Sequence, residues 1–204
     1  GAMVAAIIDW ASGSGIGFSR IVSLGNQIDV NETDMIRSIA EDPNTKVITG
    51  YIEGVADGLK FMEQARITAK EKPFLMLKGG KGESGAKAVA SHTGALAGSS
   101  EAFKTAFKHC GIQEAETIEE MFEWARAMAW QPLPKGNRVA VLTNAGGPAI
   151  LAVDALEKQG LQIASLSEDT RSFLKKRLPK AASINNPVDV LAGSGPGTYT
   201  LALE

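Results

Sequence analysis

The sequence predicts an α/β protein of two successive units, each built on a parallel sheet with helices on its faces. Strand-like and helix-like segments alternate along residues 1–130, and the alternation restarts after a segment with two prolines at 131–137. Parallel strands need long crossover connections, usually helices, so this order favours parallel sheets. We therefore expect a first domain at 1–130, a linker at 131–137 and a second domain at 138–204.

Helix signals punctuate the first unit. Asn31 with Asp34 and Thr117 with Glu120 have the spacing of capping boxes, and Asp57 is a further N-cap candidate. In order, we expect a helix at 3–11 ended by Gly13, one at 31–40, one from 57 to about 70, one ending near 109 and one from 117 to about 130.

Strand signals lie between these helices. The segment 16–24 is rich in β-forming residues, and Val, Ile, Thr and Tyr favour a strand at 46–54. The segment 73–78 is nearly all apolar, as in a strand covered on both faces, and a short strand is expected near 112–115. A glycine-rich loop is expected at 79–98. Because a doubly wound domain normally opens with a strand, the opening helix predicts a further strand upstream of residue 1.

The second unit repeats the pattern in a shorter form. Pro148 suits the first position of a helix, and the segment 185–190 is typical of a turn into a short strand. We expect a strand at 138–144, a helix at 148–159, a strand at 161–167, a helix from about 168, the short strand and a closing helix. So few strands would leave apolar faces uncovered, so we expect this sheet to be incomplete.

Composition narrows the class of protein. The net charge of −2 predicts no general attraction to nucleic acid or to anionic membranes. One cysteine excludes an internal disulfide framework and fits a reducing cytosol, so we expect a cytoplasmic protein. No apolar run approaches the roughly 20 residues that span a bilayer, and no signal peptide is visible.

The stretch SHTGALAGSS, residues 91–100, surrounds His92 with small residues and hydroxyls. A lone histidine is most often a surface or packed residue, and that alternative stays open. However, His92 follows a parallel strand on the side where open α/β sheets bind ligands. No other residue stands at metal-ligand spacing, and no G-x-S-x-G motif is present, so zinc and a serine triad are disfavoured. A nucleophile or acid–base histidine acting on an anionic group remains.

Two further segments could serve such a histidine. Glu53 ends the strand at 46–54, where it is either a solvated carboxylate or a group that orients the imidazole and stabilises its cationic form. The segment 143–148 links a strand to a helix, and it is either an ordinary tight turn or an anion site at a helix N-terminus.

Two other motifs favour structural roles. The glycines of 80–85 match G-x-G-x-x-G, but the strand before them is not the first of the unit, and at most 86–90 could be helical before Ser91. Both features disfavour a dinucleotide site. His109 precedes Gly111 at an expected helix C-terminus, where a cation is favoured by the helix dipole.

In combination, these motifs resemble the ADP-forming acyl-CoA synthetases of the succinyl-CoA synthetase superfamily. The resemblance covers essentially the whole chain, in order. It rests on SLGNQIDV at 23–30, YIEG at 51–54, KGGKG at 78–82, SHTGALAG at 91–98, TNAGGPA at 143–149 and NPVDV at 186–190.

The resemblance implies a phosphohistidine chemistry that interconverts acyl-CoA, ADP and phosphate with acid, CoA and ATP. It implies that His92 is transiently phosphorylated and that Glu53 contacts it. The residues implied to bind the phosphate are Ser91, Thr93, Gly94, Asn144, Ala145, Gly146, Gly147, Gly1 and Ala2, although Gly1-Ala2-Met3 also fits a cloning scar. Gly25 and Asn26 are implied to lie near the substrate, and no metal site is implied in this chain.

The family further implies flavodoxin-like units, a CoA-binding Rossmann domain and an ATP-grasp domain or subunit outside these residues. These would bind CoA and ADP or ATP with Mg²⁺, and the whole enzyme would form an oligomer and act on a small carboxylic acid. Two rival functions remain: a ligand-sensing region of a protein lysine acetyltransferase, and a catalytically idle CoA- or nucleotide-binding module.

Overall fold

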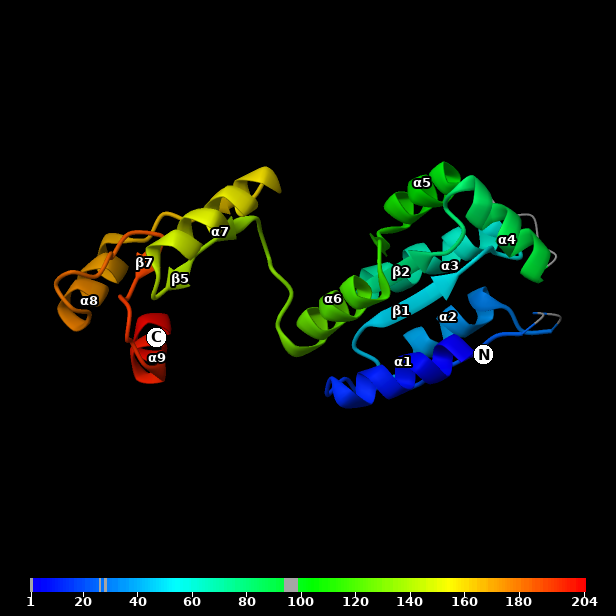
Figure 1. The fold of residues 1–204 in the computed structure, drawn as a ribbon, viewed down its shortest axis with the longest axis horizontal. Helices are drawn as coiled ribbons and strands as arrows, with labels where there is room; N and C mark the ends of the chain where they lie inside the picture. Colours follow the sequence, from blue (N-terminus) through cyan, green and yellow to red (C-terminus); the bar gives the residue numbers. More distant parts are fainter. Residues whose placement is uncertain (1, 26, 28, 94–98) are drawn as a thin grey trace. The chain divides into compact units, whose positions relative to one another are not determined.

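The computed structural model describes residues 2–25, 27, 29–93 and 99–204, with the side chains of residues 2 and 90–93 also left undescribed. The chain forms two compact units, Gly1–Leu133 and Pro134–Glu204 (Figure 1). Among the described residues, no helix is both long and apolar enough to cross a membrane.

The first unit is built around a three-stranded parallel sheet in the order β1-β2-β3. The strands β1 (Ile48–Ile52), β2 (Phe74–Lys78) and β3 (Gln113–Ala115) carry Ile52 opposite Lys78 and Leu77 opposite Ala115. The helices are α1 (Ala2–Gly13), α2 (Glu32–Ala40), α3 (Gly58–Glu71), α4 (Glu83–Thr93), α5 (Ser100–Cys110) and α6 (Ile118–Trp130). This arrangement confirms the predicted parallel α/β fold.

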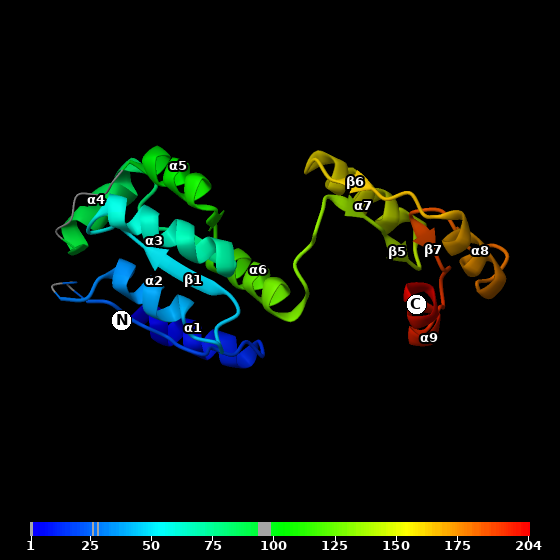
Figure 2. The ribbon, with the colours of Figure 1, turned by 180° about the vertical axis from the view of Figure 1, so that it is seen from behind.

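The central strand β2 divides the core because its side chains alternate between the two faces. Phe74 and Met76 pack with α2, α3 and α5, whereas Leu75 and Leu77 pack with α6 and α1. Figure 2 shows α2, α3 and α5 from the side opposite to that of Figure 1. All five residues of β2 are buried, as the apolar run at 73–78 predicted.

The capping signals fixed the helix boundaries well. Asn31 accepts from the backbone N–H groups of Thr33 and Asp34, and the Asp34 carboxylate accepts from the Asn31 N–H, so the predicted capping box of α2 is confirmed. The box predicted for α6 is only half formed. Thr117 accepts from the Glu120 N–H, but the Glu120 carboxylate accepts from the N–H of Glu116, one residue before the cap.

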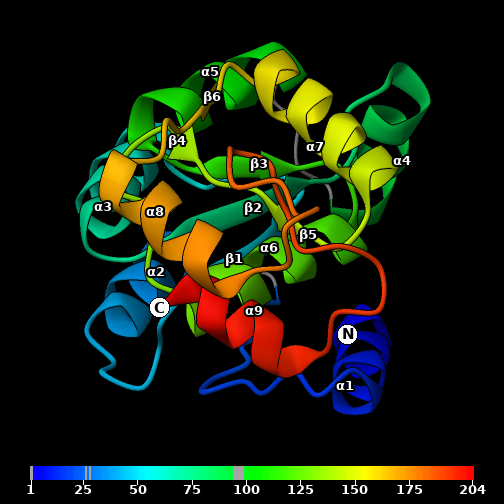
Figure 3. The same cartoon turned by 90° about the vertical axis from the view of Figure 1, so that its left-hand side faces the viewer.

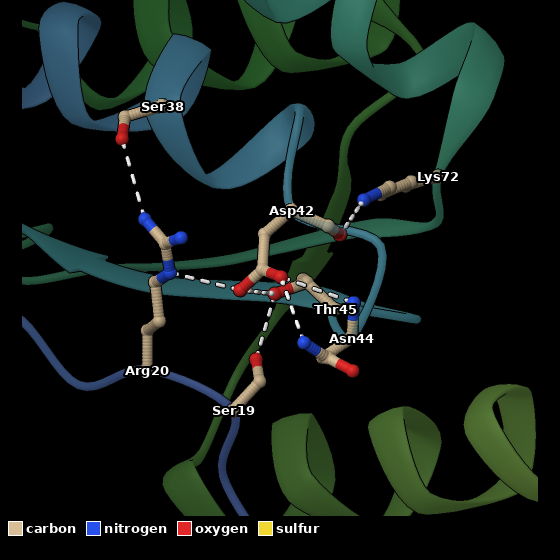
Figure 4. Close-up of polar contacts among 7 residues, drawn as sticks. All are labelled: Ser19, Arg20, Ser38, Asp42, Asn44, Thr45 and Lys72. Carbon is tan, nitrogen blue, oxygen red and sulfur yellow. Dashed lines mark hydrogen bonds and ion pairs between the residues drawn. The ribbon is translucent and has the colours of Figure 1, made fainter.

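The β-rich segment at 16–24 is not a strand, and that prediction is wrong. Ile21 and Val22 are more than 40% exposed, and the segment is held by side chains instead of a neighbouring strand. The Arg20 Nε lies 2.8 Å from Oδ2 of the buried Asp42 (Figure 4). Ser19 shares a 2.7 Å hydrogen bond with Thr45, whose own hydroxyl donates to Asp42.

Because these contacts depend on the ionised carboxylate of Asp42, we expect the stability of the first unit to depend on pH. The backbone N–H of Asn44 lowers the pKa of Asp42 below its ordinary value of 3.8, with help from Arg20 and Thr45 and against the effect of burial. A carboxyl whose pKa is depressed in the folded state stabilises the fold above its ordinary pKa, and this contribution is lost as the pH falls through the folded-state pKa.

Asp42→Asn is therefore expected to lower the urea midpoint of the first unit at neutral pH, and the difference from the wild type should shrink in acid. Urea unfolding at neutral pH and below the ordinary pKa measures both effects. Asp9→Asn, at an exposed carboxylate of α1, is the matched control and should change little at either pH. A difference between Asp42→Asn and the wild type that stayed constant on acidification would contradict this role.

The expected loop at 79–98 is instead helical over 83–93, so that part of the prediction is wrong. The Ala86 N–H donates to the Gly82 carbonyl at 2.8 Å, and Glu83 lies in the first turn, where the helix dipole favours an acid. Three glycines of this segment, Gly79, Gly80 and Gly82, lie before the helix, and Gly85 lies in its first turn. Gly80 has a φ of +71°, and a Cβ on Gly85 would meet the Gly80 Cα at 3.1 Å, so these glycines let α4 start close against the strand end.

The second unit is also parallel, but its strands are short. They are β4 (Arg138–Val139), β5 (Leu142–Thr143), β6 (Gln162–Ile163) and β7 (Val188–Asp189), and β4 pairs with β6 whereas β5 pairs with β7. The helices are α7 (Gly146–Lys158), α8 (Glu168–Arg177) and α9 (Pro196–Leu203). Figure 3 shows α7 and α9 on different sides of these strands.

The single strand predicted at 138–144 is interrupted between β4 and β5. The Asn186 side chain enters the gap: its Oδ1 accepts from the Val141 N–H at 2.8 Å, and its Nδ2 donates to Val139 and Ala164 carbonyls at 2.9 Å each. A side-chain amide thus replaces a backbone partner. Of the strand predicted at 161–167, only Gln162–Ile163 forms β6, opposite the equally short β4.

Helix α7 begins earlier than predicted, with Ala145 as the N-cap and Gly146 as the first helical residue. Pro148 is therefore the third helical residue and not the first. Its missing N–H costs nothing there, because the first N–H groups of a helix have no partner within the helix.

Candidate functional site

Charged side chains gather at the carboxyl edge of the first sheet, where open α/β sheets bind ligands. Glu53 directly follows β1, Lys78 ends β2 and Glu116 directly follows β3. The parallel register sets these positions beside one another, since Ile52 faces Lys78 and Leu77 faces Ala115.

Glu53 is held by a neighbour two residues earlier in the chain. The Tyr51 hydroxyl donates to Glu53 Oε1 at 3.1 Å. Burial raises the pKa of Tyr51, and the charge and hydrogen bond of Glu53 add to the rise. The Tyr51 ring lies against Gly79, because a Cβ there would come within 2.4 Å of the tyrosine oxygen.

Lys78 is the buried cation of this edge, with 3% of its surface exposed. Its Nζ donates to the Gly79 carbonyl and lies 4.9 Å from the centroid of the Phe103 ring. Burial lowers the pKa of Lys78, while the negative charges of Glu53 and then Glu114 oppose that shift. Lys78 therefore places a desolvated positive charge at the carboxyl edge of the sheet, and such a charge attracts anions more strongly than one in water.

Lys81 forms ion pairs with two carboxylates at the end of β3. Its Nζ lies 2.9 Å from carboxylate oxygens of both Glu114 and Glu116. The carboxylates of this pair raise the pKa of Lys81 against the effect of its partial burial, so the ammonium stays charged.

The backbone of Ser91, His92 and Thr93 forms the last turn of α4. Their side chains and the whole of Gly94 lie outside the described residues, so the pairing of His92 with Glu53 stays a prediction. Because α4 is a full helix after G-x-G-x-x-G, helix length is no argument against a dinucleotide site. The position of the motif still argues against a dinucleotide site, because it follows β2, a central strand that is not the first of the unit.

The predicted phosphate residues of the second unit lie where β5 meets α7. Asn144 and Ala145 form the turn, and Gly146 and Gly147 open the helix, which no described side chain caps. The Thr143 hydroxyl accepts from the Ala145 N–H at 3.1 Å and fixes the turn. A helix N-terminus with unpaired N–H groups can bind an anion.

Of the other predicted site residues, the structure describes some and leaves others undescribed. Ala2 is the first residue of α1, Gly25 is exposed in the segment after it, and Gly1 and Asn26 lie outside the described residues. His109 lies in the last turn of α5 before Gly111, whose φ is +78°, as predicted. Within the described part of the chain, no group of three metal-ligating side chains is found.

Sequence reasoning missed Tyr51 and Lys78 as members of this edge. Both had a visible signal. Tyr51 stands two residues before Glu53, the spacing that places strand side chains on one face, and Lys78 is a charge at the end of an apolar strand.

Comparison with known proteins matches both units to described domains. Residues 1–128 match the succinyl-CoA ligase-like flavodoxin domain, and residues 139–204 match the ligase-CoA domain. The first match agrees with the flavodoxin-like expectation for this unit.

Similar proteins share nearly the whole chain. The alpha subunit of acetate–CoA ligase (ADP-forming) II from Pyrococcus furiosus is 47% identical over 98% of this chain and 43% of its own length. Acetate–CoA ligase (ADP-forming) I from Archaeoglobus fulgidus is 41% identical over 100% of this chain and 30% of its own length. This chain thus spans less than half of each relative.

A solved structure is also similar. The dinucleotide-forming acetyl-coenzyme A synthetase 1 of Ca. Korarchaeum cryptofilum, in complex with phosphate and ADP, has a TM-score of 0.91 and 37% identity. The match covers 99% of this chain and 44% of that one. The chain therefore belongs to the family of the succinyl-CoA ligase-like flavodoxin domain.

Proposed function

We propose that this chain is the phosphoryl-transfer part of an ADP-forming acyl-CoA ligase. The complete enzyme would interconvert acyl-CoA, ADP and phosphate with the free acid, CoA and ATP. One observation carries the proposal: acetate–CoA ligases (ADP-forming) are 41–47% identical to essentially the whole chain. Such names favour this function over a ligand-sensing region of an acetyltransferase or an idle binding module.

The proposed phosphoryl transfer starts from the acyl phosphate that forms when phosphate attacks the thioester carbon of acyl-CoA, the bond between carbon and sulfur breaks and CoA leaves. In the first step of this transfer, an imidazole nitrogen of His92 attacks the phosphorus of the acyl phosphate. The bond between phosphorus and the acyl oxygen breaks, and the carboxylate leaves. In the second step, an oxygen of the ADP β-phosphate attacks the same phosphorus, the bond to nitrogen breaks and ATP forms. A covalent carrier of this kind divides one transfer between distant sites into two direct displacements.

The residues assigned to this reaction stabilise the positive charge on the imidazole or the negative charge of the phosphate. Glu53 stabilises the positive charge that grows on the imidazole as it attacks. Ser91, Thr93 and Gly94 bind the phosphoryl group beside His92. The turn Asn144–Gly147 at α7 and Gly1–Ala2 at α1 are assigned to phosphate as helix N-termini, each contributing about 0.3–2 kcal/mol. Gly25 and Asn26 are assigned to the substrate.

The remaining parts of the reaction are assigned to other domains. The chain spans 43% of the Pyrococcus furiosus alpha subunit, so we propose a CoA-binding Rossmann domain and an ATP-grasp domain or subunit as partners. The ATP-grasp part would bind the nucleotide with Mg²⁺. We place the enzyme in the cytoplasm as an oligomer that acts on a small carboxylic acid, and we keep the domain boundaries at 1–130 and 138–204.

Separating the chain from its partners tests the proposal. The complete protein is expected to form ATP from acetyl-CoA, ADP and phosphate, whereas the purified 204 residues alone should form none. A coupled assay for ATP measures both, with a panel of other acyl-CoA thioesters covering a different acyl preference. ATP formation by the 204 residues alone, or none by the complete protein with any thioester, would contradict the proposal.

A further inference from the structure

The carboxylate of Glu53 is hydrogen-bonded to a residue of β1, the strand that it follows. Tyr51 is two residues earlier on β1, and its hydroxyl donates to Glu53 Oε1 at 3.1 Å. Tyr51 lies in β1, and Glu53 is the first residue after the strand, so the hydrogen bond joins the last part of the strand to the residue that follows it. A hydrogen bond to an ionised acceptor is about twice as strong as one between neutral groups.

The strand end that carries this pair is itself fixed. The Gly79 N–H donates to the Ile52 carbonyl at 2.9 Å, which continues the β1–β2 ladder by one residue beyond the strands. The residue directly before Glu53 is therefore held in the sheet by a backbone hydrogen bond, which fixes the position of the Glu53 backbone. A side chain held in this way loses little further freedom when it acts, which favours precise orientation.

The Tyr51 ring packs against Gly79, in space that a side chain at position 79 would occupy. A Cβ on Gly79 would lie 2.4 Å from the Tyr51 oxygen and 2.8 Å from its Cζ. Real Cβ atoms do not approach so closely, so any larger residue at 79 would displace the ring. The backbone conformation of Gly79 is not in the left-handed region, so this closeness, and not a turn, is what requires glycine here.

We infer that Tyr51, seated on Gly79, is a positioning residue that aims the Glu53 carboxylate at the reacting histidine. This inference rests on the proposed function. It gives a role to Tyr51 and Gly79, which are not among the predicted site residues. Tyr51 would not touch the phosphoryl group. It would act through Glu53, by restricting the carboxylate to one direction at the carboxyl edge of the sheet.

The test is a double-mutant cycle in the complete enzyme. The rate at which labelled ATP phosphorylates the protein is measured for Tyr51→Phe, for Glu53→Ala and for the double variant. Tyr51→Phe should label about 10- to 100-fold more slowly, the range expected for one hydrogen bond to a charged group, with an unchanged KM for ATP. In the Glu53→Ala background, Tyr51→Phe should cause no further loss, because the residue acts only through Glu53.

Gly79→Ala provides an independent variant, since it displaces the ring while keeping the hydroxyl. It should slow labelling in the same direction as Tyr51→Phe. Gly82→Ala is its matched control, because a Cβ at Gly82 meets nothing within 4 Å. Tyr199→Phe, in α9 of the second unit, controls for the loss of a tyrosine hydroxyl elsewhere. Both controls should label at the wild-type rate.

The outcomes separate the inference from the function on which it rests. A wild-type rate in Tyr51→Phe, or an equal loss with and without Glu53, would overturn the inference while the labelled wild type still supports the proposed function. Failure of the wild type to take any label would overturn both.

Discussion

His92→Ala is expected to abolish phosphorylation of the complete enzyme by ATP and to lower ATP formation by on the order of 10⁴-fold or more. In the proposed reaction the imidazole forms the covalent intermediate, so no other group can complete the transfer when it is removed. Labelling with radioactive ATP and the coupled ATP assay measure the two effects.

The chain provides a matched control for this variant, because it contains only one other histidine, His109. That residue lies in the last turn of α5, where a cation contributes about 0.3–1 kcal/mol to the helix. His109→Ala should therefore keep full labelling and lose only a little stability. Full labelling of His92→Ala would remove His92 from the mechanism.

Glu53→Gln is expected to slow phosphorylation by about 10²–10⁴-fold, the usual range for a group that assists proton or charge movement at a reacting atom. Glutamine keeps the shape of the side chain and an oxygen that can accept from Tyr51, so the variant removes mainly the charge. The fold should be unaffected, because Glu53 lies just beyond a strand and outside the buried clusters. Rapid-quench labelling measures the rate directly.

Glu116→Gln is the matched control for Glu53→Gln. Glu116 also follows a strand at the carboxyl edge, but its side chain is 73% exposed and its partner is Lys81. Removing this charge should change the labelling rate by no more than a few-fold. Equal effects at both carboxylates would mean that the general charge of the edge matters, and not the place of Glu53.

Local signals in the sequence predicted much of the fold. The side chains of Asn31 and Asp57 bond N–H groups within three residues, so the starts of α2 and α3 could be inferred from the residues alone. The all-apolar run of β2 identified a strand covered on both faces. These features depend on neighbours in the chain or on burial, and both are readable from residue types.

The predictions that failed depend on distant partners. β-propensity at 16–24 cannot show whether a neighbouring strand exists, and here Asp42 binds the segment instead. The gap between β4 and β5 is filled by Asn186, which lies 45 residues after the Val141 N–H that it accepts from. The close approach of Tyr51 to Gly79 likewise follows from the register of β1 and β2, which no local pattern specifies.

The most direct test of the central claim is to map the phosphate on the labelled protein. The complete enzyme is incubated with ATP, stopped in alkali, digested and analysed by mass spectrometry under conditions that preserve phosphoramidates. The account predicts one acid-labile, base-stable phosphate on the peptide that contains His92. A phosphate on any other residue, with His92 unmodified, would contradict it.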